Sequence, residues 1–300
     1  MSAGGEVAAD RAVTGISVVI AYYRGLPDLD VQLDALSAQD FGGAFEVIVS
    51  DNEGSEELRE HVEAHPSRTR LGLRTVDSSA NAGTSHARNV GTRSAAYDFI
   101  AYCDQDDAVH SGWLTAMAAA AADADLVGGP VESETLNDPV VASWRVLPDP
   151  DEPFVSGRFL PMTFGCNLGI RREVFDAVGG WDETYPTAGS DVELCWRVQI
   201  SGYRFGYARD AMVAYRFRTG MRESWHQVVD YGREDARVAK QYGAPGRQWW
   251  WLPVHAGAVV AMCPVWPWAW SRRRRGEWVW LTGNLVGRLC GSIKYRVVYL

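Results

Sequence analysis

Three carboxylates follow a short apolar run in the first half of the chain. Phe-Ile-Ala-Tyr occupies residues 99–102, and Asp104, Asp106 and Asp107 come directly after it. The run is typical of a buried parallel strand, and strand side chains repeat with period two, so Asp104 and Asp106 can point the same way. Carboxylates held this close repel one another, and a divalent cation such as Mg²⁺ or Mn²⁺, which prefers oxygen ligands, removes the repulsion. The stretch predicts a site for a cation and a phosphorylated ligand at the end of a strand, and the alternative is a solvated acidic turn.

The surrounding segments alternate between strand-like and helix-like patterns. This rhythm predicts an α/β fold with a mostly parallel sheet, helices on both faces and ligands at the carboxyl ends of the strands. Residues 132–160 are rich in Pro and acidic residues and predict a long loop, either an active-site lid or a surface loop. Strands are expected at 16–21, 45–50, 71–76, 99–102, 126–129, 164–170, 203–208 and 212–217, and helices at 55–65, 81–94, 112–122, 172–178 and 222–242.

The composition indicates an acidic globular protein with a basic tail. The chain has 300 residues, and the apolar share of 47% excludes a disordered protein. The net charge of −9 argues against nucleic acid as a partner. Residues 271–300 hold six Arg and one Lys against one Glu. The five Cys show no Cys-x-x-Cys spacing, so neither a zinc site nor a disulfide framework is indicated. Residues 1–15 predict a disordered leader without a signal-peptide run, and we expect a cytoplasmic location.

Several motifs follow one another in a fixed order along this pattern. They are Ser17-Val-Val-Ile-Ala-Tyr-Tyr-Arg24, Val49-Ser-Asp-Asn52, Asn81-Ala-Gly-x-Ser-x-Ala-Arg-Asn-x-Gly91, Asp104-Gln-Asp-Asp107, Gly165-Cys-Asn167, Gly179-Gly-Trp-Asp-Glu183 and Ser190-Asp-Val-Glu-Leu-x-x-Arg197. In this order they resemble the family 2 glycosyltransferases, which are inverting enzymes of the GT-A fold. The chain departs from the family pattern at Ala21-Tyr-Tyr-Arg24, where Pro-x-Tyr-Asn is usual, and at Ser190-Asp191, where Glu-Asp is usual. Tyr215-Arg216 replaces a His that is often a metal ligand.

The resemblance implies a division of the chain. Residues 16–220 would form the GT-A catalytic domain, with a nucleotide-binding half at 16–130 and an acceptor-binding half at 131–220. Residues 221–300 would form a helical, Trp- and Arg-rich C-terminal extension. The implied reaction moves a sugar from a nucleotide-diphosphate sugar to a hydroxyl of an acceptor, which could be a glycan, a lipid-linked saccharide or a small molecule. The implied cofactor is Mn²⁺ or Mg²⁺. No Gln-x-x-Arg-Trp motif of processive synthases is visible, so we expect a non-processive enzyme.

The resemblance also implies roles for residues at the donor end. Asp51 would accept the imide N–H of uracil or thymine, which favours UDP or dTDP, and Tyr23 would stack on the base. Asp104 would bind the ribose hydroxyls, and Asp106 would hold the cation that bridges the two phosphates. The alternatives are a turn aspartate at Asp51 and a core tyrosine at Tyr23. The implied nucleotide-binding set is Ala21, Tyr23, Asp51, Arg88, Asp104 and Gln105.

At the acceptor end, the resemblance implies that Asp191 is the general base that takes the proton of the acceptor hydroxyl. The alternative is structural, because Ser190-x-x-Glu193 has the pattern of a helix capping box. Arg216 and Arg218 could bind the diphosphate in place of the missing His. The implied sugar or acceptor pocket comprises Gly165, Asn167, Trp181, Asp182, Glu183 and Ser190.

The C-terminal extension contains a long uncharged segment. Residues 249–270 hold six Trp and no Asp, Glu, Lys or Arg, and the run Arg272 to Arg275 follows. This pattern leaves three interpretations open: packing on the enzyme itself or on a second copy in a homodimer, peripheral contact with the inner face of a membrane, and a true membrane span.

Two other classes of protein compete with a glycosyltransferase. A nucleotidyltransferase would carry a Gly-rich phosphate loop after the first strand, and residues 21–24 are not Gly-rich. A catalytically silent binding protein of GT-A shape would not need Asp104, Asp106 and Asp191, all of which are present.

Overall fold

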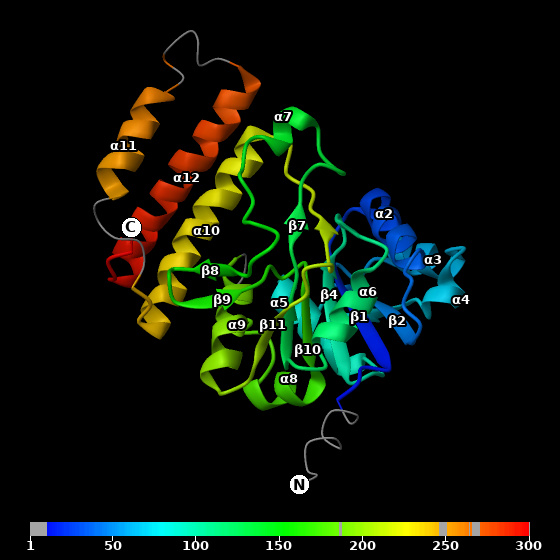
Figure 1. Cartoon of the computed structure of the whole chain (residues 1–300). Coiled ribbons are helices and arrows are strands. Elements are labelled where there is room, and N and C mark those ends of the chain that lie inside the picture. The colour runs from blue at the N-terminus through cyan, green and yellow to red at the C-terminus, as the bar shows by residue number, and fades with distance from the viewer. Residues whose placement is uncertain (1–10, 186–187, 246–250, 264, 266–270, 300) are drawn as a thin grey trace.

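The computed structural model describes residues 11–185, 188–245, 251–263, 265 and 271–299 (Figure 1). Its centre is a seven-stranded sheet in the order β11-β6-β10-β4-β1-β2-β3. The neighbouring strands are parallel except for β10, which runs antiparallel to both β4 and β6, so the predicted mostly parallel sheet is confirmed. The strands are β1 (Gly15–Tyr22), β2 (Ala44–Asp51), β3 (Arg74–Asp77), β4 (Phe99–Asp104), β6 (Leu126–Gly128), β10 (Leu168–Arg171) and β11 (Phe205–Tyr207).

Both faces of the sheet are buried under helices. Along β1, Val18 and Ile20 belong to one hydrophobic cluster and Val19 belongs to the other, as the alternation of strand side chains requires. The first cluster is covered by α2 (Leu26–Ser37), α3 (Glu56–Ala64), α4 (Arg68–Leu71) and α6 (Trp113–Ala120), and the second by residues of α8 (Arg172–Val178) and α9 (Ser190–Ile200). α5 (Thr84–Ser94) also packs on β1 and β2. Continuous apolar strands are therefore the expected sequence signature of this sheet.

Five predicted strands are shorter than expected: β6 and β11 lose end residues of 126–129 and 203–208, and three others differ more. Leu71 belongs to α4, which ends at Gly72 in a left-handed conformation, so β3 begins only at Arg74. Residues 164–167 form a turn before β10, in which the Asn167 N–H donates to the Phe164 carbonyl. Of residues 212–217, only Val213–Ala214 pair as a strand, β12, which lies between β5 (Ala108–Val109) and β7 (Val131–Glu132). Strands this short carry no periodicity that the sequence could reveal.

The predicted long loop at 132–160 contains regular structure. It includes the short helix α7 (Pro139–Ala142) and the strand β8 (Phe154–Ser156), which pairs with β9 (Leu160–Met162). Asp138 caps α7 by accepting the Val140 N–H at 2.9 Å, and Pro139 occupies the first helical position. The prediction of an irregular loop over the whole segment was therefore wrong.

The C-terminal extension is helical, as predicted. α10 (Met221–Tyr242), α11 (Trp251–Ala261) and α12 (Arg272–Tyr295) lie beside one another on one side of the molecule (Figure 1). α10 and α12 approach very closely, because a Cβ atom added at Gly287 would lie 2.3 Å from the Val229 carbonyl oxygen. The extension also packs on the domain of the central sheet, because Val238 of α10 belongs to its second hydrophobic cluster and the Tyr242 hydroxyl donates to Glu193 Oε1 at 2.7 Å. Among the helices of the described residues, none is both long and apolar enough to cross a bilayer, and residues 249–250, 264 and 266–270 of the predicted segment lie outside them.

Candidate active site

A cavity of about 980 Å³ opens at the carboxyl end of β4 and extends to the C-terminal helices. Its lining joins residues from both predicted halves of the catalytic domain with residues of α10, α11 and α12. Of the predicted site residues, those that line it are Arg88, Asp104, Asp106, Gly165, Ser190, Asp191, Arg216 and Arg218. Within the described part of the chain, the others lie outside its lining: Ala21, Tyr23, Asp51, Gln105, Asn167, Trp181, Asp182 and Glu183.

Arg88 is fixed near the end of β4 in the cavity by three contacts. Its Nη2 donates to Asp104 Oδ1 at 2.7 Å, and its guanidinium carbon lies 4.6 Å from the centroid of the buried Trp181 ring. A Cβ atom at Gly165 would lie 2.6 Å from Arg88 Nη1, so only glycine leaves room for this guanidinium. Helix α5, strand β4 and the turn before β10 therefore meet at the Arg88 guanidinium.

Asp106 and Asp107 follow Asp104 in the turn after β4. Burial, and next the charge of Asp104, raise the pKa of Asp106 from 3.8 to about 6. Burial and the charges of Asp104 and Asp106 raise the pKa of Asp107 well above its usual range. Asp107 is 1% exposed, and its Oδ1 accepts the backbone N–H of Arg216 at 2.8 Å. The mutual repulsion expected from the sequence is therefore present in the fold.

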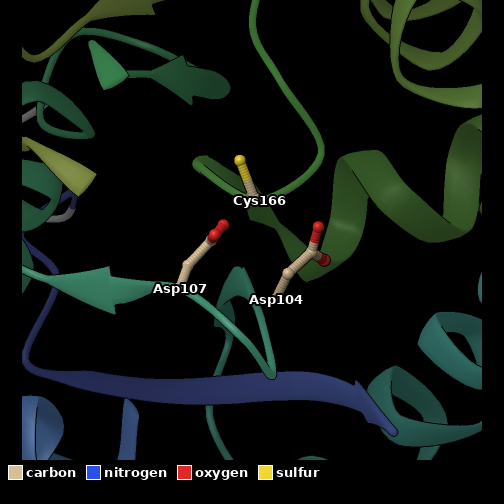
Figure 2. Close-up of side chains that lie close together, drawn as sticks. All are labelled: Asp104, Asp107 and Cys166. Carbon is tan, nitrogen blue, oxygen red and sulfur yellow. The ribbon is translucent and has the colours of Figure 1, made fainter. Parts of the chain in front are cut away.

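The residues at this point fit a divalent cation. One ligand atom each of Asp104, Asp107 and Cys166 lies within 4.8 Å of the others, and Figure 2 shows these side chains gathered around one space. Asp107 Oδ2 is buried and has no hydrogen-bond partner among the described residues, so this oxygen is available as a ligand. Burial, and then the charge of Asp107, raise the pKa of the Cys166 thiol, which makes it a poorer ligand than the carboxylates. Asp106, the predicted ligand, lines the same cavity but is not among these three residues.

Asp191 lies at the other wall of the cavity, in the first turn of α9. Its Oδ1 accepts the Val192 N–H at 2.9 Å and its Oδ2 accepts the Gly165 N–H at 3.3 Å. Burial raises the pKa of Asp191 despite these hydrogen bonds and the nearby charge of Arg88. The alternative capping box is absent, because Gly189 is the N-cap residue of α9 and Glu193 instead binds Arg197 at 2.8 Å.

Arg216 is tied to the turn that carries the acidic residues. Its Nε donates to the Asp106 carbonyl at 2.7 Å, and its Nη2 lies 3.7 Å from Asp28 Oδ1. Arg218 is exposed at the cavity wall. The segment that replaces the family's usual His therefore contacts the acidic turn through Arg216.

The predicted base-binding residues lie at the carboxyl ends of β1 and β2 and directly after β1 and β4. Asp51 is 2% exposed, and its carboxylate accepts the N–H groups of Glu53, Gly54 and Ser55 at 3.0, 2.9 and 2.7 Å. These bonds match the alternative of a turn aspartate. Gln105 Oε1 accepts the Tyr23 N–H at 2.7 Å, and the Tyr23 side chain is 56% exposed. Ala21 pairs with Asp104 in the sheet.

Several predicted pocket residues lie outside the cavity lining and form hydrogen bonds within the protein. The buried Asn167 side chain donates to the carbonyls of Pro130 and Ala211 and accepts the indole N–H of Trp113. Glu183 accepts from Asn89 at 2.7 Å and lies 2.9 Å from His86 Nδ1. Asp182 caps its own turn by accepting the Thr184 N–H.

Sequence reasoning missed the part of the cavity wall that comes from outside the motifs. This part includes Arg145 after α7, Tyr231 of α10, His255 of α11 and Trp280 of α12. Its sequence signal was weak, because residues of amphipathic helices that face a cavity have the same pattern as residues that face a core.

Comparisons with known proteins identify the family of this chain. The family model described as glycosyl transferase family 2 matches residues 17–179. A pre-mycofactocin glycosyltransferase of Mycobacterium tuberculosis is 29% identical over 193 residues, which are 60% of this chain and 39% of that protein. The succinoglycan biosynthesis protein ExoA of Rhizobium meliloti is 32% identical over 126 residues, 38% of each chain. This chain thus covers well under half the length of either relative.

Solved structures share the fold at low sequence identity. S. aureus TarS, residues 1-349, in complex with UDP-GlcNAc has a TM-score of 0.56 and 16% identity, over 94% of this chain and 92% of that one. A mannosyltransferase from Pyrobaculum calidifontis in complex with GDP-Man and Mn²⁺ has a TM-score of 0.53 and 18% identity, over 91% and 86% of the two chains. The motif order, the sheet topology and the family match lead to one conclusion: the chain belongs to glycosyl transferase family 2 and has the GT-A fold.

Proposed function

We propose that this protein transfers a sugar, with inversion at the anomeric carbon, from a UDP- or dTDP-sugar to an acceptor hydroxyl, with the help of Mn²⁺ or Mg²⁺. One observation carries the proposal: Asp104 and Asp106 at the end of β4 line the same cavity as Asp191 at the start of α9. A transferase that acts on a diphosphate sugar needs carboxylates at both ends of one cavity. Those at one end hold the leaving diphosphate, and the one at the other end activates the attacking hydroxyl.

The donor end would bind the nucleotide diphosphate. Asp104 would accept from the ribose hydroxyls, and Arg88, stacked on Trp181, would lie next to the diphosphate. Asp107, whose buried Oδ2 has no hydrogen-bond partner among the described residues, would hold the cation together with Asp106, which lines the same cavity. When bound, the cation would stabilise the negative charge of the departing diphosphate. Mn²⁺ accompanies the donor in the mannosyltransferase named above, which supports this assignment.

Asp191 would act as the general base. Its carboxylate faces the cavity, and burial raises its pKa, which strengthens it as a proton acceptor. The N–H groups of Val192 and Gly165 hold the carboxylate in one orientation. It would take the proton of the acceptor hydroxyl while that oxygen attacks the anomeric carbon from the side opposite the leaving diphosphate, so the configuration at this carbon inverts.

The stereochemistry of slow donor hydrolysis tests the proposal without a known acceptor. We would incubate the full chain with Mn²⁺ and UDP-α-sugars and follow the released sugar by proton NMR before it mutarotates. The proposal predicts that the β-anomer appears first and that EDTA stops its release. First appearance of the α-anomer would contradict inversion, and release that is equally fast in EDTA would contradict the role of the cation.

A further inference from the structure

Arg145 lies in the cavity inside a shell of aromatic rings. Its guanidinium carbon is 4.7 Å from the ring centroid of Trp280 and 5.6 Å from that of Phe164. The ring centroids of Tyr215, Phe217 and Tyr231 each lie at 6.0 Å. The shell brings together the turn before β10, the segment after β12, α10 and α12, which are far apart in sequence. Five aromatic rings therefore surround the Arg145 guanidinium, and the faces of such rings attract a cation.

The charge of Arg145 is not matched by a carboxylate. Within the described part of the chain, Arg145 forms no hydrogen bond and no ion pair, whereas three other arginines of the cavity each lie near a carboxylate. Arg88 pairs with Asp104, Arg216 lies near Asp28, and Arg288 lies 3.6 Å from Asp235. Aromatic faces compensate only part of the hydration that a half-buried guanidinium loses.

The donor groups of Arg145 remain accessible from the cavity. None of its nitrogen atoms is among the buried polar atoms that lack a partner, although the residue lines the cavity wall. Arg158 and Arg218 line the same cavity, are exposed, and likewise have no ion pair with a described residue. Arg145, Arg158 and Arg218 thus add three positive charges to the cavity lining, which favours an anionic ligand, and the guanidinium geometry of Arg145 suits a phosphoryl group.

We propose that Arg145 binds a phosphoryl group of the acceptor substrate. This inference rests on the proposed function and specifies its acceptor as a phosphorylated molecule. The guanidinium would stay stacked on Trp280, and its N–H groups would donate to the phosphoryl oxygens in the plane of the guanidinium. Arg145 is in this sense a specificity residue, because an acceptor without the anion would leave it unpaired.

The placement of Arg145 favours the acceptor over the donor as the source of the anion. The donor end is marked by Asp104, Asp106 and Arg88, which come from β4, the turn after it and α5. Arg145 comes from the half of the domain that follows residue 131, and its nearest ring, Trp280, belongs to the C-terminal extension. A donor diphosphate would already have Arg88 and the cation as partners.

Calorimetric titrations of the full chain can separate the two sources. Inorganic phosphate is titrated into protein saturated with Mg²⁺ and UDP, and UDP is titrated separately in the presence of Mg²⁺. The variants are Arg145→Met and Arg145→Lys, and Arg273→Met is the control, because Arg273 is exposed and does not line the cavity. Thermal unfolding of each variant shows whether it is folded.

We expect phosphate to bind the UDP-saturated protein and its Kd to rise about tenfold or more in Arg145→Met, with partial rescue in Arg145→Lys. The Kd of UDP should stay within about twofold, and Arg273→Met should behave as the wild type. Phosphate that competes with UDP, together with weaker UDP binding in Arg145→Met, would overturn the acceptor assignment. Absence of phosphate binding, or an unchanged phosphate Kd in folded Arg145→Met, would overturn the inference and leave Arg145 a packing residue. Failure of UDP itself to bind would instead count against the proposed function.

Discussion

Arg88 Nη2 lies 2.7 Å from Asp104 Oδ1, so an ion pair joins helix α5 to the end of strand β4 inside the cavity. The Arg88 side chain is 6% exposed and that of Asp104 is 32% exposed, so the pair is only partly screened by solvent. The same guanidinium stacks on Trp181, which lies outside the cavity lining. This one contact therefore couples the stability of the domain to the geometry of the proposed donor site.

Replacement of Arg88 by methionine should lower both stability and nucleotide affinity. Asp104 would lose its partner, and we expect a loss of about 2 kcal/mol in the free energy of unfolding, because removing one member of a partly buried pair leaves the other unpaired. Urea unfolding and UDP titration measure the two effects. Arg93→Met, an exposed position on the same helix, is the control. Normal UDP affinity in folded Arg88→Met would contradict the donor-site role.

Asp106→Asn should stabilise the metal-free protein at neutral pH. The pKa of Asp106 is about 6 in the folded state against an ordinary 3.8, so the folded state binds this proton more tightly. Ionisation of Asp106 therefore costs stability as the pH rises from about 4 to about 6, up to about 3 kcal/mol above that window. Thermal unfolding in EDTA should show a higher Tm for Asp106→Asn at pH 7.5 and convergence with the wild type near pH 4. The control is Asp98→Asn, where the side chain is 98% exposed. Equal Tm values for Asp106→Asn and the wild type at pH 7.5 would refute the raised pKa of Asp106 in the folded state.

Asp191→Asn should strongly reduce turnover without weakening nucleotide binding. An amide cannot take the proton of the attacking hydroxyl, and loss of a general base typically lowers kcat by about 10²–10⁴-fold. Hydrolysis of the donor sugar measures kcat, and calorimetry measures the Kd of UDP, which should stay within about twofold of the wild type. Asp176→Asn, an exposed position on α8, should match the wild type. A variant that keeps its kcat would remove Asp191 from the reaction.

The C-terminal extension should bind anionic vesicles. Val254 and Val260 of α11 are 57% and 67% exposed, and Arg272 to Arg275 at the start of α12 are all exposed. Replacement of these four arginines by glutamine should weaken flotation with anionic vesicles strongly, since each basic residue near such a surface contributes about 1 kcal/mol. Neutral vesicles should bind both proteins weakly. Arg68→Gln with Arg70→Gln, at exposed positions outside the extension, is the charge control. Equal flotation of the quadruple variant and the wild type would exclude an electrostatic membrane contact.

The long elements of the fold could be predicted from the sequence, because apolar runs such as residues 16–21 and 99–102 determine buried strands almost alone. The two-residue strands β5, β7 and β12 could not, since their pairing depends on tertiary contacts. At the site, the motifs identified Asp104, Asp106 and Asp191, which line one cavity. They did not identify Cys166 beside Asp107 or Arg145 among its rings, because both neighbourhoods form only after segments distant in sequence come together.

The dependence of nucleotide binding on the cation tests the central claim most directly. UDP is titrated calorimetrically into the full chain with Mn²⁺ and again with EDTA, for the wild type and for Asp106→Asn. The account predicts tight UDP binding only in the wild type with Mn²⁺. In EDTA or in Asp106→Asn, the Kd of UDP should be at least about tenfold higher, which corresponds to a loss of about 1.4 kcal/mol in binding free energy. Equally tight UDP binding with and without the metal would contradict a cation at the end of β4.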